Sequence, residues 1–333
     1  MSTSVKVGVV EVVRETGDAV SLVLDARLPY KPGQFLTLRV PGGAARCYSL
    51  ASSPHTGEPM KVTVKRVPGG LGSGWVCDRV TAGDELEVLA PAGTFTPRDL
   101  DRDVVLVAGG SGITPVLSIA KSVLAAGRGR AVLLYANREQ NAVIFRDELW
   151  GLAEAHPGRF AVVHWLETLQ GLPTAQLLGA ALAPYAGRDA YLCGPRPLMD
   201  AAEAALRAAG ACTVSREKYF SLADDVFGRA PAAATATAAG AQAAHTARVT
   251  LDGESHEVGW AAEVPLLDTL LAAGIDAPYS CREGACSACC CRVVSGEVKM
   301  LRNEVLDEED LAEGYVLACQ AVPLSARVEI GYE

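Results

Sequence analysis

Four cysteines near the C-terminus are spaced like the ligands of an iron–sulfur cluster. Cys281 and Cys286 are separated by four residues, and Cys286 and Cys289 by two. Cys319 follows after 29 further residues. In the plant-type pattern, four thiolates with this spacing hold the two irons of a [2Fe–2S] cluster. A structural zinc site usually has two C-x2-C pairs or a cysteine–histidine pair, and a thioredoxin-type site needs only one C-x2-C pair. The spacing therefore predicts a [2Fe–2S] cluster.

Two extra cysteines, Cys290 and Cys291, adjoin this motif. They lie in a predicted strand over residues 289–296, where neighbouring side chains point to opposite faces. Packing is the simpler interpretation of both, and Cys290 stays open as an alternative ligand, although it breaks the two-residue spacing. Most other residues of the loop between the expected ligands have small side chains, so backbone N–H groups can approach the bridging sulfides. Its small residues are Gly284, Ala285, Ser287 and Ala288.

A second group of residues could bind a flavin. The segment "RCYS" contains Arg46, Tyr48 and Ser49, and the segment "GGLGS" contains Gly70, Gly72 and Ser73. An arginine can hold a pyrophosphate through two hydrogen bonds, a tyrosine can stack on the flavin, and a serine hydroxyl can hydrogen-bond the flavin N5. Alone, each segment could be an ordinary strand or turn. Together, and followed by a nucleotide-binding segment, they indicate a flavin site.

The segment "VLVAGGSGITP", residues 105–115, has the order of strand, glycine-rich turn and helix that binds dinucleotides. Its glycines would let a pyrophosphate reach the helix N-terminus, which carries roughly half a positive charge. Thr114 is the expected N-cap of this helix, with Pro115 at the first helical position and Gly127 at the end. The glycines are Gly109, Gly110 and Gly112.

The segment "YLCGP", residues 191–195, ends another predicted strand, at the edge where parallel sheets bind ligands. A lone buried cysteine is usually inert, but the Gly194 and Pro195 that follow favour a contact between Cys193 and a nicotinamide. No acidic residue ends the strand that runs into "YANREQ", where it could bind a ribose 2′-hydroxyl. Arg138 in that segment could meet a 2′-phosphate or be solvated, so these residues leave NADH and NADPH open.

The pattern of the whole chain predicts three domains and a linker. Residues 1–100 consist of short β-branched runs separated by turns, which predicts a small antiparallel β-barrel. Residues 101–228 alternate strands and helices, as in an α/β doubly wound parallel sheet. The alanine-rich residues 229–245 have no core pattern and are expected to be a linker. Residues 246–333 form a further small, β-rich unit.

Composition limits the possible functions. The chain has 333 residues, half of them hydrophobic, which indicates several globular domains. We expect a cytoplasmic protein with no membrane span, because neither a signal peptide nor a run of eighteen apolar residues is seen. Its cysteines would then serve metals or catalysis rather than disulfides. From residue 246 onward, 16 acidic residues outnumber 6 basic ones, which accounts for the net charge of −9. No nucleic-acid surface is expected. The acidic end is either a solvated surface or a docking face for a basic partner.

These motifs together resemble the ferredoxin–NADP reductase superfamily, and more narrowly the oxygenase reductases with a C-terminal plant-type ferredoxin domain. The resemblance covers nearly the whole chain except the linker. Within that group, "YANREQNAVIFRDEL" and "VVHWLETLQGLP" are similar to reductases of 3-ketosteroid 9α-hydroxylases, with phenylacetyl-CoA epoxidase reductases as near relatives. The resemblance implies a β-barrel for FAD, an α/β domain for NAD(P)H and an α+β ferredoxin domain of β-grasp type.

The resemblance also implies roles for individual residues. Arg46, Tyr48 and Ser49 would bind the flavin, with Val64, Lys65, Gly72 and Ser73 completing its site. Gly110, Thr114, Cys193 and Gly194 would face NAD(P)H. An aromatic residue is expected over the flavin near the end of the nucleotide domain, either Tyr219 or, with a shifted register, Phe220. Core packing is the alternative interpretation of both aromatic residues.

The resulting hypothesis is an NADH-dependent reductase component of an oxygenase. A hydride from NAD(P)H would pass to FAD, and single electrons would leave through the [2Fe–2S] cluster. Ser49 and Cys193 would position the reactants rather than act as acids or bases. The expected acceptor is a Rieske-type steroid or aromatic-ring monooxygenase that docks on the acidic ferredoxin domain. FMN and NADPH are the less favoured cofactors.

Two other functions remain open. The acceptor could be a phenylacetyl-CoA-type di-iron epoxidase. The protein could also be a redox sensor with no terminal oxygenase, although a sensor needs no complete path for electrons from NAD(P)H and flavin. The long linker leaves the relative orientation of the ferredoxin domain undetermined.

Overall fold

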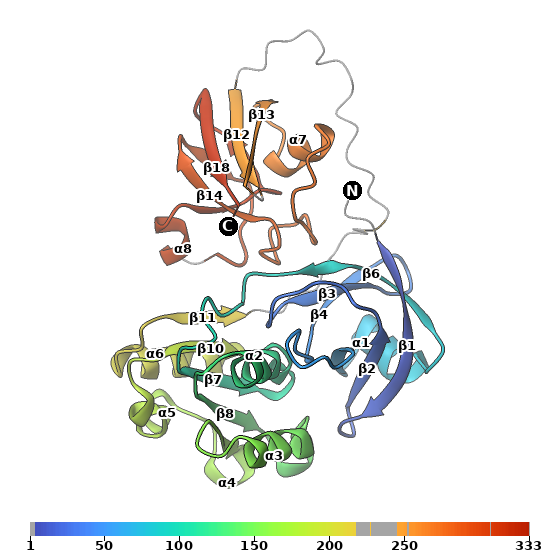
Figure 1. The fold of residues 1–333 in the computed structure, drawn as a ribbon, viewed down its shortest axis with the longest axis vertical. Coiled ribbons are helices and arrows are strands. Elements are labelled where there is room, and N and C mark those ends of the chain that lie inside the picture. The colour runs from blue at the N-terminus through green and yellow to red at the C-terminus, as the bar shows by residue number, and fades with distance from the viewer. Residues whose placement is uncertain (1–3, 218–226, 228–244, 252, 307, 333) are drawn as a thin grey trace.

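A computed structural model of the chain describes residues 4–217, 227, 245–251, 253–306 and 308–332. Three bodies follow one another along the chain, each built around its own main sheet (Figure 1). The first and second pack side by side, and the third lies across the outer side of the first.

The first body is an antiparallel barrel, as predicted. Its strands are β1 (Val5–Arg14), β2 (Ala19–Asp25), β3 (Phe35–Arg39), β4 (Ala45–Ser49), β5 (Met60–Lys65) and β6 (Glu85–Ala92). They lie in the order β4-β3-β6-β1-β2-β5, and a bridge between Leu50 and Val62 joins the two ends of the sheet. Alternate residues such as Leu22 and Leu24 fill the interior. Helix α1 (Leu71–Arg79) packs on this core through Val76.

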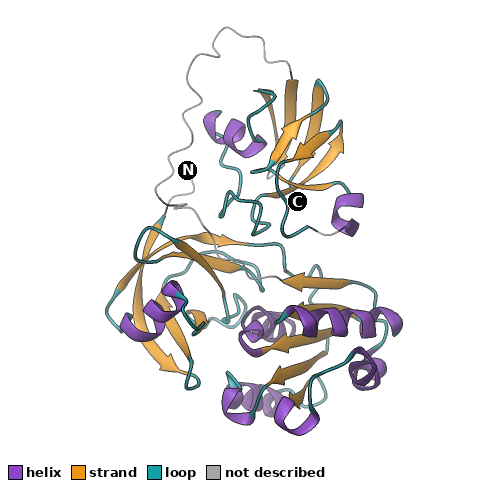
Figure 2. Cartoon of the chain, turned by 180° about the vertical axis from the view of Figure 1, so that it is seen from behind, coloured by secondary structure: helices purple, strands orange, loops and turns teal. Residues whose placement is uncertain are grey.

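The second body is a parallel sheet with helices on both faces, which confirms the doubly wound prediction (Figure 2). Its strands are β7 (Val104–Gly109), β8 (Ala131–Asn137), β9 (Phe160–Leu166), β10 (Asp189–Cys193) and β11 (Val214–Glu217), in the order β11-β10-β7-β8-β9. The helices are α2 (Ile113–Ala126), α3 (Arg146–Ala155), α4 (Glu167–Gln170), α5 (Ala175–Leu182) and α6 (Arg196–Ala208). Leu106 packs in a core with α2 and α3, whereas Val107 packs with α5 and α6. A strand buried on both faces explains the continuous apolar run in β7.

The start of α2 corrects one sequence prediction. Thr114 is not the N-cap: a 3-10 turn over Gly110–Gly112 runs directly into the helix, and Gly112 is the N-cap. The Thr114 hydroxyl instead donates back to the carbonyl of Ser111 at 3.2 Å, as helical threonines often do. Pro115 therefore lies within the first turn, where the missing N–H costs nothing. Gly127 ends the helix as predicted.

The third body is a small α+β domain. Its main sheet contains β12 (His245–Leu251), β13 (Glu254–Trp260), β14 (Cys290–Ser295), β16 (Tyr315–Leu317) and β18 (Arg327–Gly331), in the order β13-β12-β18-β14-β16. A second pair is formed by β15 (Val298–Met300) and β17 (Ala321–Pro323), and the helices are α7 (Leu266–Ala272) and α8 (Glu308–Ala312). Trp260 is fully buried, and its indole N–H donates to Val264 O at 2.8 Å. Among the residues described, none of the helices has the length and apolar character needed to span a membrane.

Candidate functional site

Strand β4 brings the predicted flavin residues to α1. Successive strand residues point to opposite sides, so Arg46 and Tyr48 share one face and Cys47 occupies the other. A Cβ on Gly72 would lie 2.8 Å from Arg46 Cγ and 3.4 Å from the Tyr48 hydroxyl. Burial raises the pKa of Tyr48, which stays a neutral phenol. Ser49 is buried at the end of the strand. The "RCYS" and "GGLGS" segments thus meet, although they are far apart in sequence.

The N-terminus of α1 is suited to an anion. Its N-cap, Gly70, brings no side-chain acceptor to the helix start. Ser73 Oγ accepts a hydrogen bond from the Val67 backbone N–H at 3.0 Å, which fixes the turn before the helix. A glycine at position 72 keeps the space between the helix and Arg46 free, because any Cβ there would collide with the arginine. A helix N-terminus beside an arginine fits the pyrophosphate of a flavin dinucleotide.

The glycine-rich turn and the "CGP" segment meet at the edge of the parallel sheet. β7 and β10 are neighbours in register, so both strands end at this edge. A Cβ on Gly112 would lie only 2.1 Å from the Cys193 carbonyl oxygen, and a Cβ on Gly194 would lie 2.9 Å from Gly109 N. Only glycines allow this close backbone approach. Cys193 is fully buried. Parallel sheets bind ligands at this edge, so the arrangement fits a dinucleotide.

Lys65 and Pro195 lie against the same turn. Lys65, on β5, has its Nζ 3.8 Å from where a Cβ on Gly110 would lie, and it pairs with Asp18 at 3.6 Å. Its neighbour Val64 is buried in the barrel core. Pro195 is the N-cap residue of α6 and approaches the first glycine of the turn. The predicted flavin and nucleotide residues therefore come together at the junction of the two bodies.

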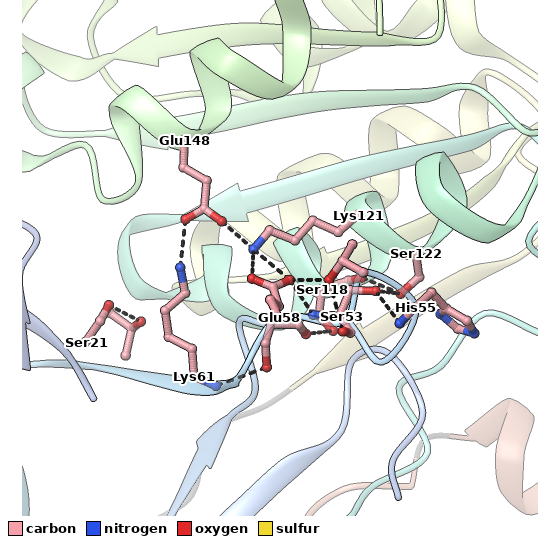
Figure 3. Close-up of polar contacts among 12 residues, drawn as sticks. Ser21, Ser53, His55, Glu58, Lys61, Ser118, Lys121, Ser122 and Glu148 are labelled. Atoms are coloured by element: carbon pink, nitrogen blue, oxygen red, sulfur yellow. Dashed lines mark hydrogen bonds and ion pairs between the residues drawn. The ribbon is translucent and has the colours of Figure 1, made fainter. Parts of the chain in front are cut away.

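A polar face of α2 fixes this junction (Figure 3). Ser118, Lys121 and Ser122 lie on one side of the helix and face the chain that leaves β4. The Ser118 hydroxyl donates to the Ser52 carbonyl at 2.6 Å, and the hydroxyls of Ser122 and Ser53 lie 2.8 Å apart. The helix that starts at the nucleotide turn is thus hydrogen-bonded to the segment that follows the flavin motif.

Lys121 is also the central residue of an ion-pair network (Figure 3). Its side chain is 5% exposed and pairs with Glu58 at 2.8 Å and with Glu148 on α3. Lys61 on β5 pairs with Glu148 at 2.8 Å and lies 4.8 Å from the ring centre of Phe145. Burial would raise the pKa of Glu148, but the two lysines outweigh it and the net pKa is lowered. The network ties the barrel to both α2 and α3.

Glu217 is a half-buried acid that the sequence reasoning missed. It ends β11 and lies opposite Cys193 in the parallel pair of β10 and β11. Burial raises the pKa of its carboxyl to about 8. A charged residue at the carboxyl end of a sheet strand was the available signal. The predicted Tyr219 and its alternative Phe220 lie outside the described residues.

The third body buries the four predicted ligand cysteines at one end. Cys281, Cys286, Cys289 and Cys319 are 1%, 8%, 2% and 5% exposed. None of the ten cysteines, all of which lie among the described residues, is part of a disulfide. The Cys281 sulfur accepts hydrogen bonds from the N–H groups of Glu283 and Ala285, both at 3.3 Å. Hydrogen bonds from the neighbouring Cys286 and Cys319 thiols, and from these N–H groups, lower the pKa of Cys281. Buried, unoxidised sulfurs with backbone donors fit an iron–sulfur cluster.

The surrounding loop supports the same assignment. Gly284, Arg282 and Ser287 adopt positive φ angles, which fold the chain tightly between the ligand positions. Cys291 is buried in the domain core and Cys290 packs against it, as expected for packing residues.

A barrel with an arginine–tyrosine–serine strand, a dinucleotide fold and a four-cysteine loop define a flavin-dependent electron-transfer reductase. Comparison with protein families supports this class of protein. The oxidoreductase FAD-binding domain family matches residues 12–96, the oxidoreductase NAD-binding domain family residues 106–204, and the 2Fe-2S iron-sulfur cluster binding domain family residues 249–324.

Individual relatives narrow the class. The chain is 53% identical to the ferredoxin reductase component of 3-ketosteroid-9-alpha-monooxygenase from Mycolicibacterium smegmatis, over 98% of this chain and 96% of the relative. It is 32% identical to a component of 1,2-phenylacetyl-CoA epoxidase from Escherichia coli, over 100% and 99%. The solved phthalate dioxygenase reductase superposes with a TM-score of 0.58 at 26% identity, covering 99% of this chain and 98% of that one. The chain belongs to the family of oxygenase reductase components, which deliver electrons from NAD(P)H through FAD and a [2Fe–2S] cluster to an oxygenase.

Proposed function

We propose that the chain is the NADH-dependent reductase of a 3-ketosteroid 9α-monooxygenase of the Rieske type. The observation that carries this proposal is the full-length identity with the M. smegmatis reductase, which is much higher than that with the epoxidase component. We further propose that the protein works in the cytoplasm, where a reducing environment keeps cysteines out of disulfides, as all ten are in this structure.

We propose domain boundaries and residue roles to match. The domains are the flavin barrel 1–100, the nucleotide domain 101–228, the linker 229–245 and the ferredoxin domain 246–333. Bound FAD and the cluster supply the redox chemistry, in which electrons arrive as a hydride and leave singly. Arg46 would hold the flavin pyrophosphate at the start of α1, Tyr48 would stack on the flavin, and Ser49 would hydrogen-bond its N5.

The remaining roles are those that the resemblance to oxygenase reductases implies. Val64, Lys65, Gly70, Gly72 and Ser73 would line the rest of the flavin site. Gly109, Gly110, Gly112 and Thr114 would hold the nucleotide phosphates, and Cys193, Gly194 and Pro195 would contact the nicotinamide. Cys281, Cys286, Cys289 and Cys319 would ligate the cluster. The burial of these four cysteines keeps water away from the cluster and fixes the orientation of the ligands.

The proposed docking surface for the oxygenase is the acidic ferredoxin domain. The net charge of the chain is concentrated there. Exposed carboxylates include Glu308 and Glu313 around α8, and Glu254 and Glu257 on β13. Such a surface would steer a basic partner and weaken with added salt.

A coupled assay tests the function. The purified reductase is combined with a 3-ketosteroid oxygenase or with a phenylacetyl-CoA epoxidase, and product is measured against NADH or NADPH consumed. We expect steroid hydroxylation coupled to NADH oxidation, with a higher kcat/KM for NADH. Better coupling to the epoxidase would refute the steroid assignment, and a preference for NADPH would refute the choice of NADH. Reduction of flavin and cluster by NADH without transfer to either oxygenase would favour the sensor.

A further inference from the structure

The ferredoxin domain packs its cluster loop on the outer face of the barrel. An apolar cluster joins the two domains. Its barrel members are Phe35, Ala45, Leu89 and Ala92 with the partly buried Cys47, and its ferredoxin members are Cys281, Ala285, Cys286 and Ala288. Every residue from 280 to 290 is buried or half-buried. The ligand loop is therefore enclosed by its own domain and the barrel.

A single strand separates this contact from the flavin residues. On β4, Arg46 and Tyr48 face α1, as the close approach to Gly72 shows. Cys47, between them in sequence, faces the other way and packs with Cys281 and the rest of the apolar cluster. The strand therefore presents the flavin motif on one side and the cluster ligands on the other, with only its own backbone between them.

Two buried hydroxyls set the register of the contact. Thr37 on β3 is the strand partner of Cys47, and its Oγ1 lies 3.4 Å from the Cys47 sulfur. The same Oγ1 lies 2.5 Å from the hydroxyl of Ser280, the residue directly before the first ligand. Thr37 and Ser280 are both 1% exposed. Leaving a buried hydroxyl without its hydrogen-bond partner costs free energy. This hydrogen bond therefore favours one docking position, whereas an apolar contact alone would allow several.

A second hydrogen bond between hydroxyls lies at the edge of the contact between the two domains. The Thr94 hydroxyl, just after β6, donates to Ser287 within the ligand loop at 3.2 Å. Phe227 packs against the same apolar cluster, with the Arg39 guanidinium 5.6 Å from its ring centre. Three separate segments of the first two domains thus fit one end of the third.

From these contacts, and relying on the proposed roles of Arg46 and Tyr48, we propose that the outer face of β3 and β4 is the docking site at which the cluster receives its electrons. Cys47, Thr37 and Ser280 are positioning residues that fix the cluster behind the flavin motif. One electron leaves the reduced flavin and one enters the oxidised cluster, so no bond is made and no proton moves in this step. NAD(P)H supplies the electrons.

Two variants test the docking site without any oxygenase. Thr37→Val removes the hydroxyl and keeps the shape, and Cys47→Arg places a charge in the apolar contact. Val10→Arg, at an exposed position of β1, is the matched control for an added arginine. Stopped-flow absorbance after mixing with NADH follows flavin reduction and cluster reduction as separate phases. Small-angle X-ray scattering reports whether the domains stay together, independently of turnover.

We expect flavin reduction to be unchanged in all three variants. Cluster reduction should slow about fivefold in Thr37→Val, the effect of one lost hydrogen bond, and by at least about tenfold in Cys47→Arg, since a buried unpaired charge costs more. The radius of gyration should increase in Cys47→Arg only. Parent rates of cluster reduction in both variants would overturn the proposal. If Cys47→Arg fails to retain flavin, the rate of Thr37→Val alone decides. Because no oxygenase is present, a failed steroid assignment would leave this result standing, and the reverse also holds.

Discussion

Replacing Lys121 by methionine should destabilise the junction between barrel and nucleotide domain. Methionine keeps the length of the side chain but leaves Glu58 without its buried partner and Glu148 with Lys61 only. Breaking a buried ion pair on one side costs about 3–5 kcal/mol. The two carboxylate side chains are 25% and 28% exposed. Water therefore screens them in part, and we expect a loss near the lower limit, about 3 kcal/mol.

Thermal and urea unfolding measure this loss. For a unit of this size, a loss of that order lowers Tm by about 6 to 12 °C. Lys6→Met is the matched control, because the Lys6–Glu85 pair has side chains 72% and 57% exposed and such pairs contribute little. Adding Glu58→Gln to Lys121→Met should recover part of the loss by removing an unpaired charge.

The pH dependence gives a second check. The folded-state pKa of Glu148 is lowered, so its ion pairs stabilise the fold above the unfolded-state pKa, and this stability is lost as pH falls through the folded-state value. The gap between parent and Lys121→Met should therefore narrow below about pH 4.5. A Lys121→Met protein that unfolds together with the parent at neutral pH would refute the structural role of the network.

Three further predictions concern other parts of the site. Gly112→Ala should raise the KM for NADH while flavin content is unchanged, since its Cβ would lie 2.1 Å from the Cys193 carbonyl oxygen; a parent KM would contradict the nucleotide site. Cys319→Ser should lower bound iron and sulfide yet leave NADH reduction of the flavin intact, and full cluster content would exclude Cys319 as a ligand. The folded-state pKa of Glu217 is raised to about 8. Its contribution to stability is therefore complete below the unfolded-state pKa and falls as pH rises towards 8. Glu217→Gln should make Tm less dependent on pH in that range, and an unchanged slope would count against the raised pKa of Glu217.

Local patterns made much of this architecture predictable. The ligand cysteines lie in two short segments, because metal–thiolate geometry restricts their spacing. The barrel and the parallel sheet follow from period-two runs and from alternating strands and helices. The end of α2 at Gly127 was predictable for the same reason, since a glycine closes a helix locally.

Other features depend on contacts between distant segments. Helix α1 was missed because "LGSGWVCDR" has two glycines and weak helical periodicity; its packing on the barrel core overrides that preference. A lysine such as Lys121 would be expected to be exposed to solvent. It can be buried because it forms an ion pair with Glu58, which is 63 residues away in the sequence. The contact of Thr37 with Ser280 spans 243 residues, so no local pattern could have indicated it.

The two domain contacts differ in a way that suits their proposed tasks. Barrel and nucleotide domain share one apolar core, in which Ala19, Ala51 and Phe95 of the first pack with α2 of the second. The buried charges of Lys121 add directionality, so the two domains are held in one orientation. Hydride transfer needs such precision, because the reacting atoms must approach to within bonding distance. The ferredoxin contact relies instead on apolar residues and on hydroxyl pairs such as Thr37 with Ser280, which are uncharged and therefore less costly to separate than a buried ion pair. A domain that takes electrons from the barrel and gives them to another protein is better served by such a contact than by a fixed one.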